Sequence, residues 1–290
     1  MALDQYKEEE EEEQGMSFLD HLEALRWHLL RSVSAVLILT VIAFLAKSIV
    51  FGVIILGPSK VDFITYRLFC DLGNYLGVAA LCIEELPFTL QSREMTSQFS
   101  MHMTSSLVVG FIVAFPYLFW EVWRFISPGL YDKEKNAARG AVFFVSFLFF
   151  MGASFGYFVL APMSINFLSN YQLDPTIINE FDISSYISTL TMLVLASAIM
   201  FQLPVVVYFL SKSGLVTAAM LRSYRRHAIV IILVVSAIIT PPDVISQILI
   251  AMPILVLYEA GIQIAKRLEK EKAVKRAAEE LEDLEEENKD

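Results

Sequence analysis

FPYLFWEVWRFISPGLYDKEKN, residues 115–136, leads from an apolar run through a series of aromatic residues into a charged loop. Residues 117–125, directly before the turn at residues 127–129, include five aromatic side chains: Tyr117, Phe119, Trp120, Trp123 and Phe125. Trp and Tyr are enriched where a membrane meets water, and Pro followed by Gly interrupts a helix. The stretch therefore predicts the end of a transmembrane helix and, at residues 124–137, a short loop. Toward its end that loop carries four consecutive charged residues: Asp132, Lys133, Glu134 and Lys135.

The composition of the whole chain places this helix in a membrane protein. Of its 290 residues, 56% are hydrophobic and 22 are Phe. Several apolar runs approach the ~20 residues that cross a hydrocarbon layer about 30 Å thick. The net charge of −10 lies largely in two acidic tails, and nucleic-acid binding would need a basic face instead. The sequence also lacks a G-x-x-x-x-G-K-[ST] phosphate loop, which excludes nucleotide hydrolysis by that route.

The apolar runs predict an all-α polytopic protein with six transmembrane helices. The first run follows an acidic tail at residues 1–15, whose like charges favour disorder, and an interfacial helix at residues 17–29. Gly57-Pro58 ends the first run and Ala161-Pro162 ends the third. The fifth run is short for a span, but a tight Pro-Pro turn joins it to the sixth, and short spans can thin the bilayer. The six approximate spans are 30–49, 103–123, 138–160, 185–210, 228–240 and 244–262.

Lys and Arg predict the orientation, because short cytoplasmic flanks carry them in excess. With six spans, both termini lie on the same side, which we predict to be the cytoplasm. Residues 59–100 then form a cap segment on the opposite face, and residues 263–290 form a charged cytoplasmic tail. The side of the termini carries most of the flanking cations: Arg26, Arg31, Arg124, Lys133, Lys135, Arg139, Lys212, Arg222, Arg225, Arg226, Lys266 and Arg267.

Six motifs resemble, in order, those of the TatC family of the twin-arginine protein translocase: MSFLDHLEALRWHLL, FPYLFWEVWRFISPGLYDKEK, GYFVLAP, FQLPVVVYFL, LRSYRRHAIV and TPPDVISQILIAMPILVLYE. The resemblance covers about residues 16–262. It implies a non-enzymatic receptor in the cytoplasmic (inner) membrane that binds twin-arginine signal peptides of folded cargo. It further implies TatA- and TatB-type single-span partners, self-association in a complex, a lipid bilayer as surroundings, the proton-motive force as energy source and no cofactor.

The resemblance places the signal-peptide site at the loop that follows the second span. Glu134 stands where the family carries its signal-peptide-binding Glu, and Phe125 matches the aromatic residue at the start of the loop. A carboxylate suits this role because it accepts two hydrogen bonds from the planar donor fork of a guanidinium. The alternative for Glu134 is a solvated charge that balances its neighbouring lysines. Three further residues match the turn of the family: Pro128, Leu130 and Tyr131.

The helix before the first span is the second part of the implied site. The family pattern is H-L-x-E-L-R, whereas residues 21–26 read HLEALR. Ala24 therefore takes the usual place of Glu, and Glu23 stands one residue earlier, which on a helix is a rotation of ~100°. Glu23 and Arg26 remain candidates for signal-peptide binding. Glu23 is alternatively an exposed charge, with Glu134 acting alone or with backbone carbonyls.

Three polar residues near the later spans are candidates for other roles. Gln202 and Pro204 lie within the fourth span, where a polar side chain is costly and tends to be functional; the alternative is an interhelical hydrogen bond of about 0.6 kcal/mol. Asp243 is predicted to cap the sixth span. Glu259, near the end of that span, is predicted to reach water or pair with a basic residue. Both are candidates for structural or partner contacts.

Cys70 and Cys82 fall in the predicted exported segment, where an oxidising compartment permits a disulfide, but their spacing cannot establish the geometry. We predict no metal site. The four histidines form neither an H-E-x-x-H motif nor a Cys/His cluster, and Met101-His102-Met103 alone offers too few ligands for a soft metal. A secondary transporter, the remaining alternative, would be expected to show an internal repeat or paired polar residues at the midplane.

Overall fold

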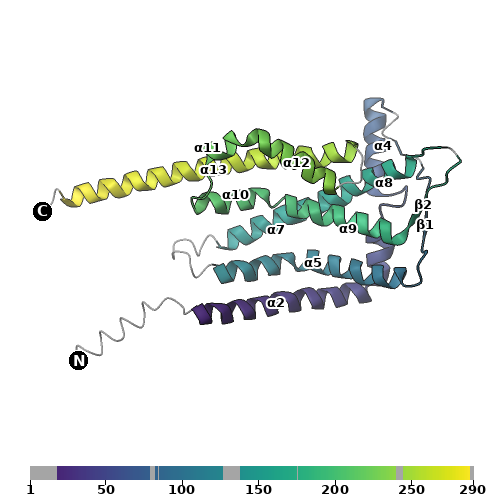
Figure 1. Cartoon of the computed structure of the whole chain (residues 1–290), viewed down its shortest axis with the longest axis horizontal. Helices are drawn as coiled ribbons and strands as arrows, with labels where there is room; N and C mark the ends of the chain where they lie inside the picture. Colours follow the sequence, from purple (N-terminus) through teal and green to yellow (C-terminus); the bar gives the residue numbers. More distant parts are fainter. Residues whose placement is uncertain are drawn as a thin grey trace.

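The computed structural model describes residues 18–78, 82–83, 85–126, 138–174, 176–239 and 244–287. Its long helices lie side by side in a bundle, and a small sheet lies at one end (Figure 1). The start of α2 and the end of α13 lie at the opposite end. The main helices of the bundle are α2 (Phe18–Leu45), α5 (Ser97–Ile126), α7 (Ala138–Phe155), α9 (Ile183–Met200), α10 (Leu203–Lys212), α12 (Arg225–Ile239) and α13 (Val244–Glu287).

Five helical stretches among the described residues are long and apolar enough to cross a membrane. The prediction of a helical, multi-pass membrane protein is therefore confirmed. The run predicted as the fifth span corresponds to α12, whose 15 residues extend only about 22 Å at 1.5 Å per residue. The count of six spans and the cytoplasmic location of both termini stay predictions. The five stretches are Leu25–Leu45, Ser97–Phe125, Gly140–Asn170, Ile183–Lys212 and Gln247–Ala278.

The first span differs from the prediction at both ends. The helix predicted at residues 17–29 is continuous with the first span, because α2 runs without interruption from Phe18 to Leu45 and contains no Gly or Pro that would break it. Its location at the membrane interface stays a prediction. The chain turns at Ala46 rather than continuing toward residue 56. The short helix α3 (Lys47–Ile49) and the π-helix η1 (Val50–Ile55) follow this turn.

The sequence predicted that Pro162 ends the third span, but the helix continues past it. The chain stays helical through the π-helix η4 (Gly156–Leu160) and α8 (Ala161–Asn170), with Pro162 in the first turn of α8. A proline inside a helix leaves the carbonyl four residues earlier without its usual N–H donor. Here that carbonyl belongs to Phe158, and the hydroxyl of Thr65 donates to it at 2.6 Å. A residue distant in sequence thus supplies a hydrogen bond that the proline cannot.

The fourth predicted span is two helices rather than one. A turn at Phe201-Gln202 separates α9 from α10, and Pro204 lies in the first turn of α10.

The last helix, in contrast, is longer than expected. α13 continues through residue 263, where we placed the start of a tail, and its Lys272 Nζ donates to the backbone carbonyls of Ser211 and Lys212 at 3.1 and 2.7 Å.

The two polar segments after the first and third spans meet in the small sheet. Strands β1 (Thr89–Gln91) and β2 (Glu180–Asp182) pair in parallel, with Leu90 opposite Phe181. Asp182 caps α9 by accepting from the backbone N–H of Ser184 at 2.8 Å, and it also accepts from the N–H of Arg93 at 3.2 Å. These hydrogen bonds lower the pKa of Asp182, and the bond from the backbone of Ser184 has the largest effect. In the same region a disulfide joins Cys70, in α4 (Ile64–Leu76), to Cys82.

α2 and α5 approach closely at Gly110, and this contact yields a prediction. A β-carbon at Gly110 would lie 2.6 Å from the backbone N of Thr40 on α2, whereas one at Gly140 would meet nothing within 4 Å. Small residues allow such approaches between membrane helices. We expect Gly110→Ala to destabilise the fold by about 1–3 kcal/mol, typical of overpacking, and to lower Tm in detergent. The matched control, Gly140→Ala, should leave Tm unchanged, and equal effects of the two changes would contradict the assigned contact.

Candidate functional site

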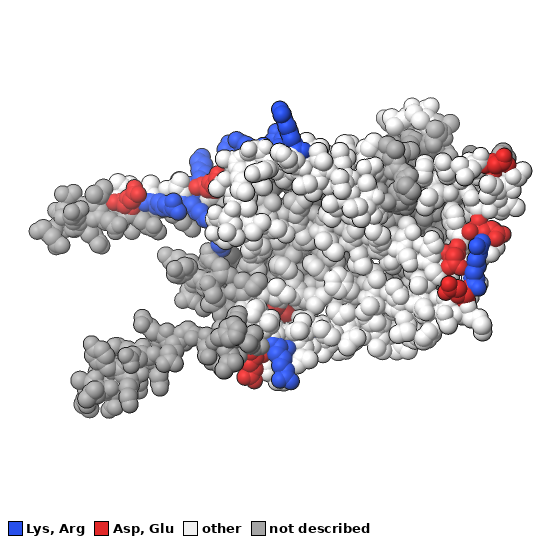
Figure 2. Space-filling view, in the orientation of Figure 1, with Lys and Arg blue, Asp and Glu red and all other residues white. Residues whose placement is uncertain are grey.

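The candidate site lies at the end of the bundle where α2 begins, α5 ends and α7 begins (Figure 1). The chain between Ile126 and Ala138, which contains most of the predicted binding loop, connects α5 to α7. Figure 2 shows charges of both signs at each end of the bundle: at this end Lys and Arg lie beside Asp and Glu over the start of α2 and along α13, and a second mixed group lies at the opposite end. The first group includes cations whose positions predicted the orientation.

The predicted binding residues fall into two groups. Glu134, Pro128, Leu130, Tyr131 and Asp243 lie outside the residues that the structure describes. Three others lie at the candidate site: Glu23 and Arg26, exposed near the start of α2, and Phe125, half-buried near the end of α5. The structure thus brings the start of α2 and the end of α5 together, as the resemblance implies.

A buried carboxylate, which the sequence analysis missed, joins these two helices. Glu121 on α5 is only 1% exposed. Its Oε2 lies 2.5 Å from Nδ1 of His28 on α2, and its Oε1 accepts from the hydroxyl of Tyr117 at 2.8 Å. The positive charge of Arg31 also acts on this carboxylate. A buried carboxylate needs such partners, because removing a charge from water costs several kcal/mol when it is unpaired.

His28 connects the buried carboxylate to the predicted site. Its imidazole ring meets the ring of Phe125 edge to face, with centroids 6.0 Å apart. When Glu121 is ionised, Nδ1–H of His28 donates to it, and this fixes both the tautomer and the orientation of the ring. Glu121 therefore orients His28, and His28 in turn supports Phe125 at the start of the loop. We call Glu121, His28 and Tyr117 the α2–α5 polar cluster.

The sequence contained a signal for this cluster. Glu121 is an acidic residue within the apolar and aromatic run of the second predicted span, and a charged residue inside a span is a functional-site candidate by default. Its partner could not be identified, because His28 is 93 residues away along the chain. Position 24, where the family carries its Glu, precedes His28 by one helical turn and therefore lies on the same face of α2. Glu23 stands one residue earlier and so lies on a different face from His28.

Gln202 lies at the break between α9 and α10, and Pro204 lies in the first turn of α10. The side-chain amide of Gln202 donates to the backbone carbonyl of Val145 on α7 at 3.3 Å, while its Oε1 is buried without a hydrogen-bond partner among the described residues. Pro204 borders an apolar cavity of about 370 Å³ that also involves Trp123 and Phe209. Gln202 thus makes the interhelical hydrogen bond that was the structural alternative for it.

Glu259 pairs with a basic residue, one of the two outcomes that we predicted for it. Arg225 on α12 donates through Nε and Nη2 to the two carboxylate oxygens of Glu259 on α13, at 2.7 and 2.8 Å. Both side chains are about half exposed, so solvent screening limits what the pair contributes to stability. Within the described residues, no group of three or more His, Cys, Asp or Glu side chains is placed to hold a metal ion.

Comparison with known proteins gives a consistent family match. The model of the family TatC, Sec-independent protein translocase protein, matches residues 20–253. A relative from Blattabacterium sp. subsp. Periplaneta americana, named Sec-independent protein translocase protein TatC, is 38% identical over 263 residues, which cover 90% of this chain and 99% of the relative. A protein of the same name from Helicobacter pylori is 46% identical over 161 residues, 56% of this chain and 64% of the relative.

Solved structures agree with this match. A crystal structure of the twin arginine translocase receptor TatC shares 34% identity and superposes with a TM-score of 0.64, covering 86% of this chain and 99% of that one. A second crystal structure of that receptor, in DDM, gives a TM-score of 0.66 at 34% identity, with 84% and 99% of the two chains covered.

Proposed function

The chain belongs to the TatC family of Sec-independent protein translocase proteins, and we propose that it is the receptor subunit that binds twin-arginine signal peptides of folded cargo. As a family member it is a transport protein rather than a catalytic enzyme. The observation that carries the proposal is the contact between His28 and Phe125. This contact joins the two segments, residues 16–29 and 124–137, to which the family resemblance assigns signal-peptide binding.

The proposed recognition uses a carboxylate beside an aromatic surface. Glu134 accepts hydrogen bonds from the guanidinium groups of the signal peptide, for which a planar carboxylate is well matched. Phe125 offers a ring on which a guanidinium can stack. In this proposal the turn between Phe125 and Glu134 is formed by Pro128, Leu130 and Tyr131. The site is bordered on the side of α2 by the exposed residues Glu23 and Arg26.

The proposed topology has six spans and places the N- and C-termini in the cytoplasm. The alternating direction of the helices in Figure 1 supports it, because α2 begins and α13 ends at the same end of the bundle. In this topology α12 crosses as the short fifth span, which a locally thinned bilayer accommodates. The proposed membrane is the cytoplasmic (inner) membrane, and the binding site faces the cytoplasm.

The proposed partners are TatA- and TatB-type single-span subunits, which this chain recruits for export driven by the proton-motive force. Further copies of the chain take part in the same complex. Two residues are candidates for structural or partner contacts: Asp243, between the fifth and sixth spans on the face opposite the cytoplasm, and Glu259, near the cytoplasmic end of the sixth span.

A photocrosslinking experiment tests the proposed receptor function. With benzoylphenylalanine in place of Phe125, which preserves an aromatic ring, we expect capture of a twin-Arg signal peptide and at least tenfold weaker capture of its twin-Lys counterpart. The reason is that Lys offers a point charge rather than the planar donor fork of Arg. Benzoylphenylalanine in place of Phe158, which belongs to η4 in the far half of the bundle, serves as the positional control. Equal capture of the two peptides by the crosslinker at residue 125 would refute the proposed receptor function.

A further inference from the structure

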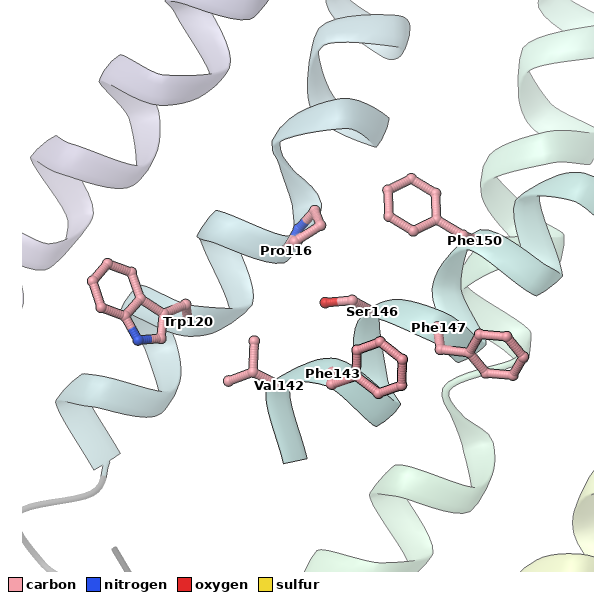
Figure 3. A pocket seen from close by; sticks show the side chains of 7 residues that line it. All are labelled: Pro116, Trp120, Val142, Phe143, Ser146, Phe147 and Phe150. Carbon is pink, nitrogen blue, oxygen red and sulfur yellow. The ribbon is translucent and has the colours of Figure 1, made fainter. Parts of the chain in front are cut away.

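A furrow between α5 and α7 is not used by the proposed receptor function. It forms a cavity of about 500 Å³ to which α5 contributes Pro116 and Trp120, and α7 contributes Phe143, Ser146 and Phe150 among others. Figure 3 shows these side chains from close by, with Ser146 pointing from α7 toward α5. The two helices meet at one side of the furrow through Phe115 and Phe149, whose rings stack with centroids 3.5 Å apart. We refer to this cavity as the α5–α7 furrow.

The lining of the α5–α7 furrow is apolar, aromatic and open to the surroundings of the protein. Trp120 is 46% exposed and Phe143 is 74% exposed. Both residues belong to stretches apolar enough to cross a membrane, so these side chains face the bilayer. Ser146 is a polar residue in this apolar lining and is 8% exposed. Its buried hydroxyl has no hydrogen-bond partner among the residues described. Its hydroxyl is therefore available as a donor to a polar group in the furrow.

A cation lies at the end of the furrow nearest the loop. Arg124 follows Trp120 by one turn of α5, and its guanidinium carbon lies 5.9 Å from the centroid of the Trp120 ring. Arg124 and Arg31 are both exposed, and both act electrostatically on Tyr117, whose ring centroid lies 5.8 Å from that of Trp120. The nearby carboxylate of Glu121 is buried and already paired. The entrance of the furrow therefore favours an anion.

We propose that the α5–α7 furrow is a binding site for an anionic phospholipid. One acyl chain lies along the aromatic lining, the phosphate contacts Arg124, and Ser146 donates a hydrogen bond to an ester carbonyl oxygen. Basic pockets between membrane helices bind anionic headgroups in this way. An arginine stacked on an aromatic ring is suited to the phosphate because its guanidinium is planar and presents several donors.

The dimensions and the lining favour a lipid over a helix. From Phe143 to Phe150 the furrow extends only roughly 10 Å along α7, at 1.5 Å per residue, whereas a helix with its side chains is itself about 10 Å across. Membrane helices that pack closely on one another use small residues at the contact. The furrow instead presents the large rings of Trp120, Phe143 and Phe150, which keep a second helix at a distance and leave room for a flexible chain.

Native mass spectrometry of the full-length chain, stripped of lipid and titrated with phosphatidylglycerol or phosphatidylcholine, tests this site. We expect one phosphatidylglycerol to bind about fivefold more tightly than phosphatidylcholine, because one arginine near the membrane surface contributes about 1 kcal/mol toward an anionic lipid. Arg124→Gln should remove this preference. The control is Arg226→Gln, which deletes the same charge from α12 and should retain the preference.

A fluorescence measurement locates the lipid. Phosphatidylglycerol with brominated acyl chains should quench the tryptophan fluorescence of the wild-type chain more than that of the Trp120→Phe variant, provided that both have the same Tm. Equal affinity for the two lipids, or equal losses in the Arg124→Gln and Arg226→Gln variants, would overturn the proposal. It would also be overturned if a photocrosslinker in place of Phe143 captured a signal peptide or a single-span subunit instead of lipid.

Discussion

Replacement of Glu134 by alanine is expected to reduce the capture of a twin-Arg signal peptide by at least tenfold while leaving insertion of the chain into the membrane intact. Hydrogen bonds to charged groups contribute about 1.5–3 kcal/mol each, which corresponds to a roughly 10- to 150-fold change in affinity. The measurement is crosslinking of a labelled signal peptide through benzoylphenylalanine in place of Phe125, in membranes that contain equal amounts of each variant. Export of a twin-Arg cargo should fall in parallel.

Two further variants distinguish a bound carboxylate from a general electrostatic effect. Glu134→Gln keeps the size of the side chain and removes its charge, so it should resemble the alanine variant. Asp132→Asn removes a negative charge from the same loop and should retain most of the capture. If Asp132→Asn and Glu134→Gln lowered capture equally, the loop would act only through its net charge. Unaltered export by the Glu134→Ala variant would refute the role assigned to Glu134.

The sequence predicted the helical bundle well where apolar runs are long and uninterrupted. The runs that became α5 and α7 were each found near their observed positions because about 20 apolar residues have few alternatives to a membrane-spanning helix. The predictions were weaker where proline was taken as a boundary. Pro162 lies within a continuous helical segment, because Thr65 satisfies the carbonyl of Phe158. That hydrogen bond connects residues 93 positions apart, and a local sequence pattern cannot reveal it.

The same limitation applies to the candidate site. The family motifs identified Phe125 and the start of α2 from the sequence alone, and the structure places these segments in contact. The buried pair of His28 and Glu121 remained unrecognised, since each residue taken singly looks like a polar residue near the end of a span. Only the packing of α2 on α5 shows that the two side chains hold the helices together.

The α2–α5 polar cluster provides the second large expected effect. Glu121→Leu removes the acceptor for both His28 and Tyr117. The His28 side chain is only 17% exposed, and a largely buried donor without a partner costs about 1–3 kcal/mol. We therefore expect a lower Tm in detergent. Because His28 no longer supports Phe125, and an edge-to-face aromatic contact contributes about 0.5–1.5 kcal/mol, we also expect a roughly 2- to 10-fold loss of twin-Arg peptide capture. Glu121→Gln, which can still accept from Tyr117, should be closer to the wild type in both measurements.

A double-mutant cycle separates this cluster from an ordinary contact between helices. If Glu121 acts through His28, the losses caused by Glu121→Leu and His28→Leu should not add, since residues in one hydrogen-bond network couple by 0.5–3 kcal/mol. The matched control is Glu259→Gln, which breaks another Glu pair between helices. Because that pair is about half exposed, its removal should change stability by less than about 1 kcal/mol. Fully additive effects at positions 28 and 121 would show that the two side chains stabilise the helices independently, and Phe125 would then owe its position to the packing of α5 alone.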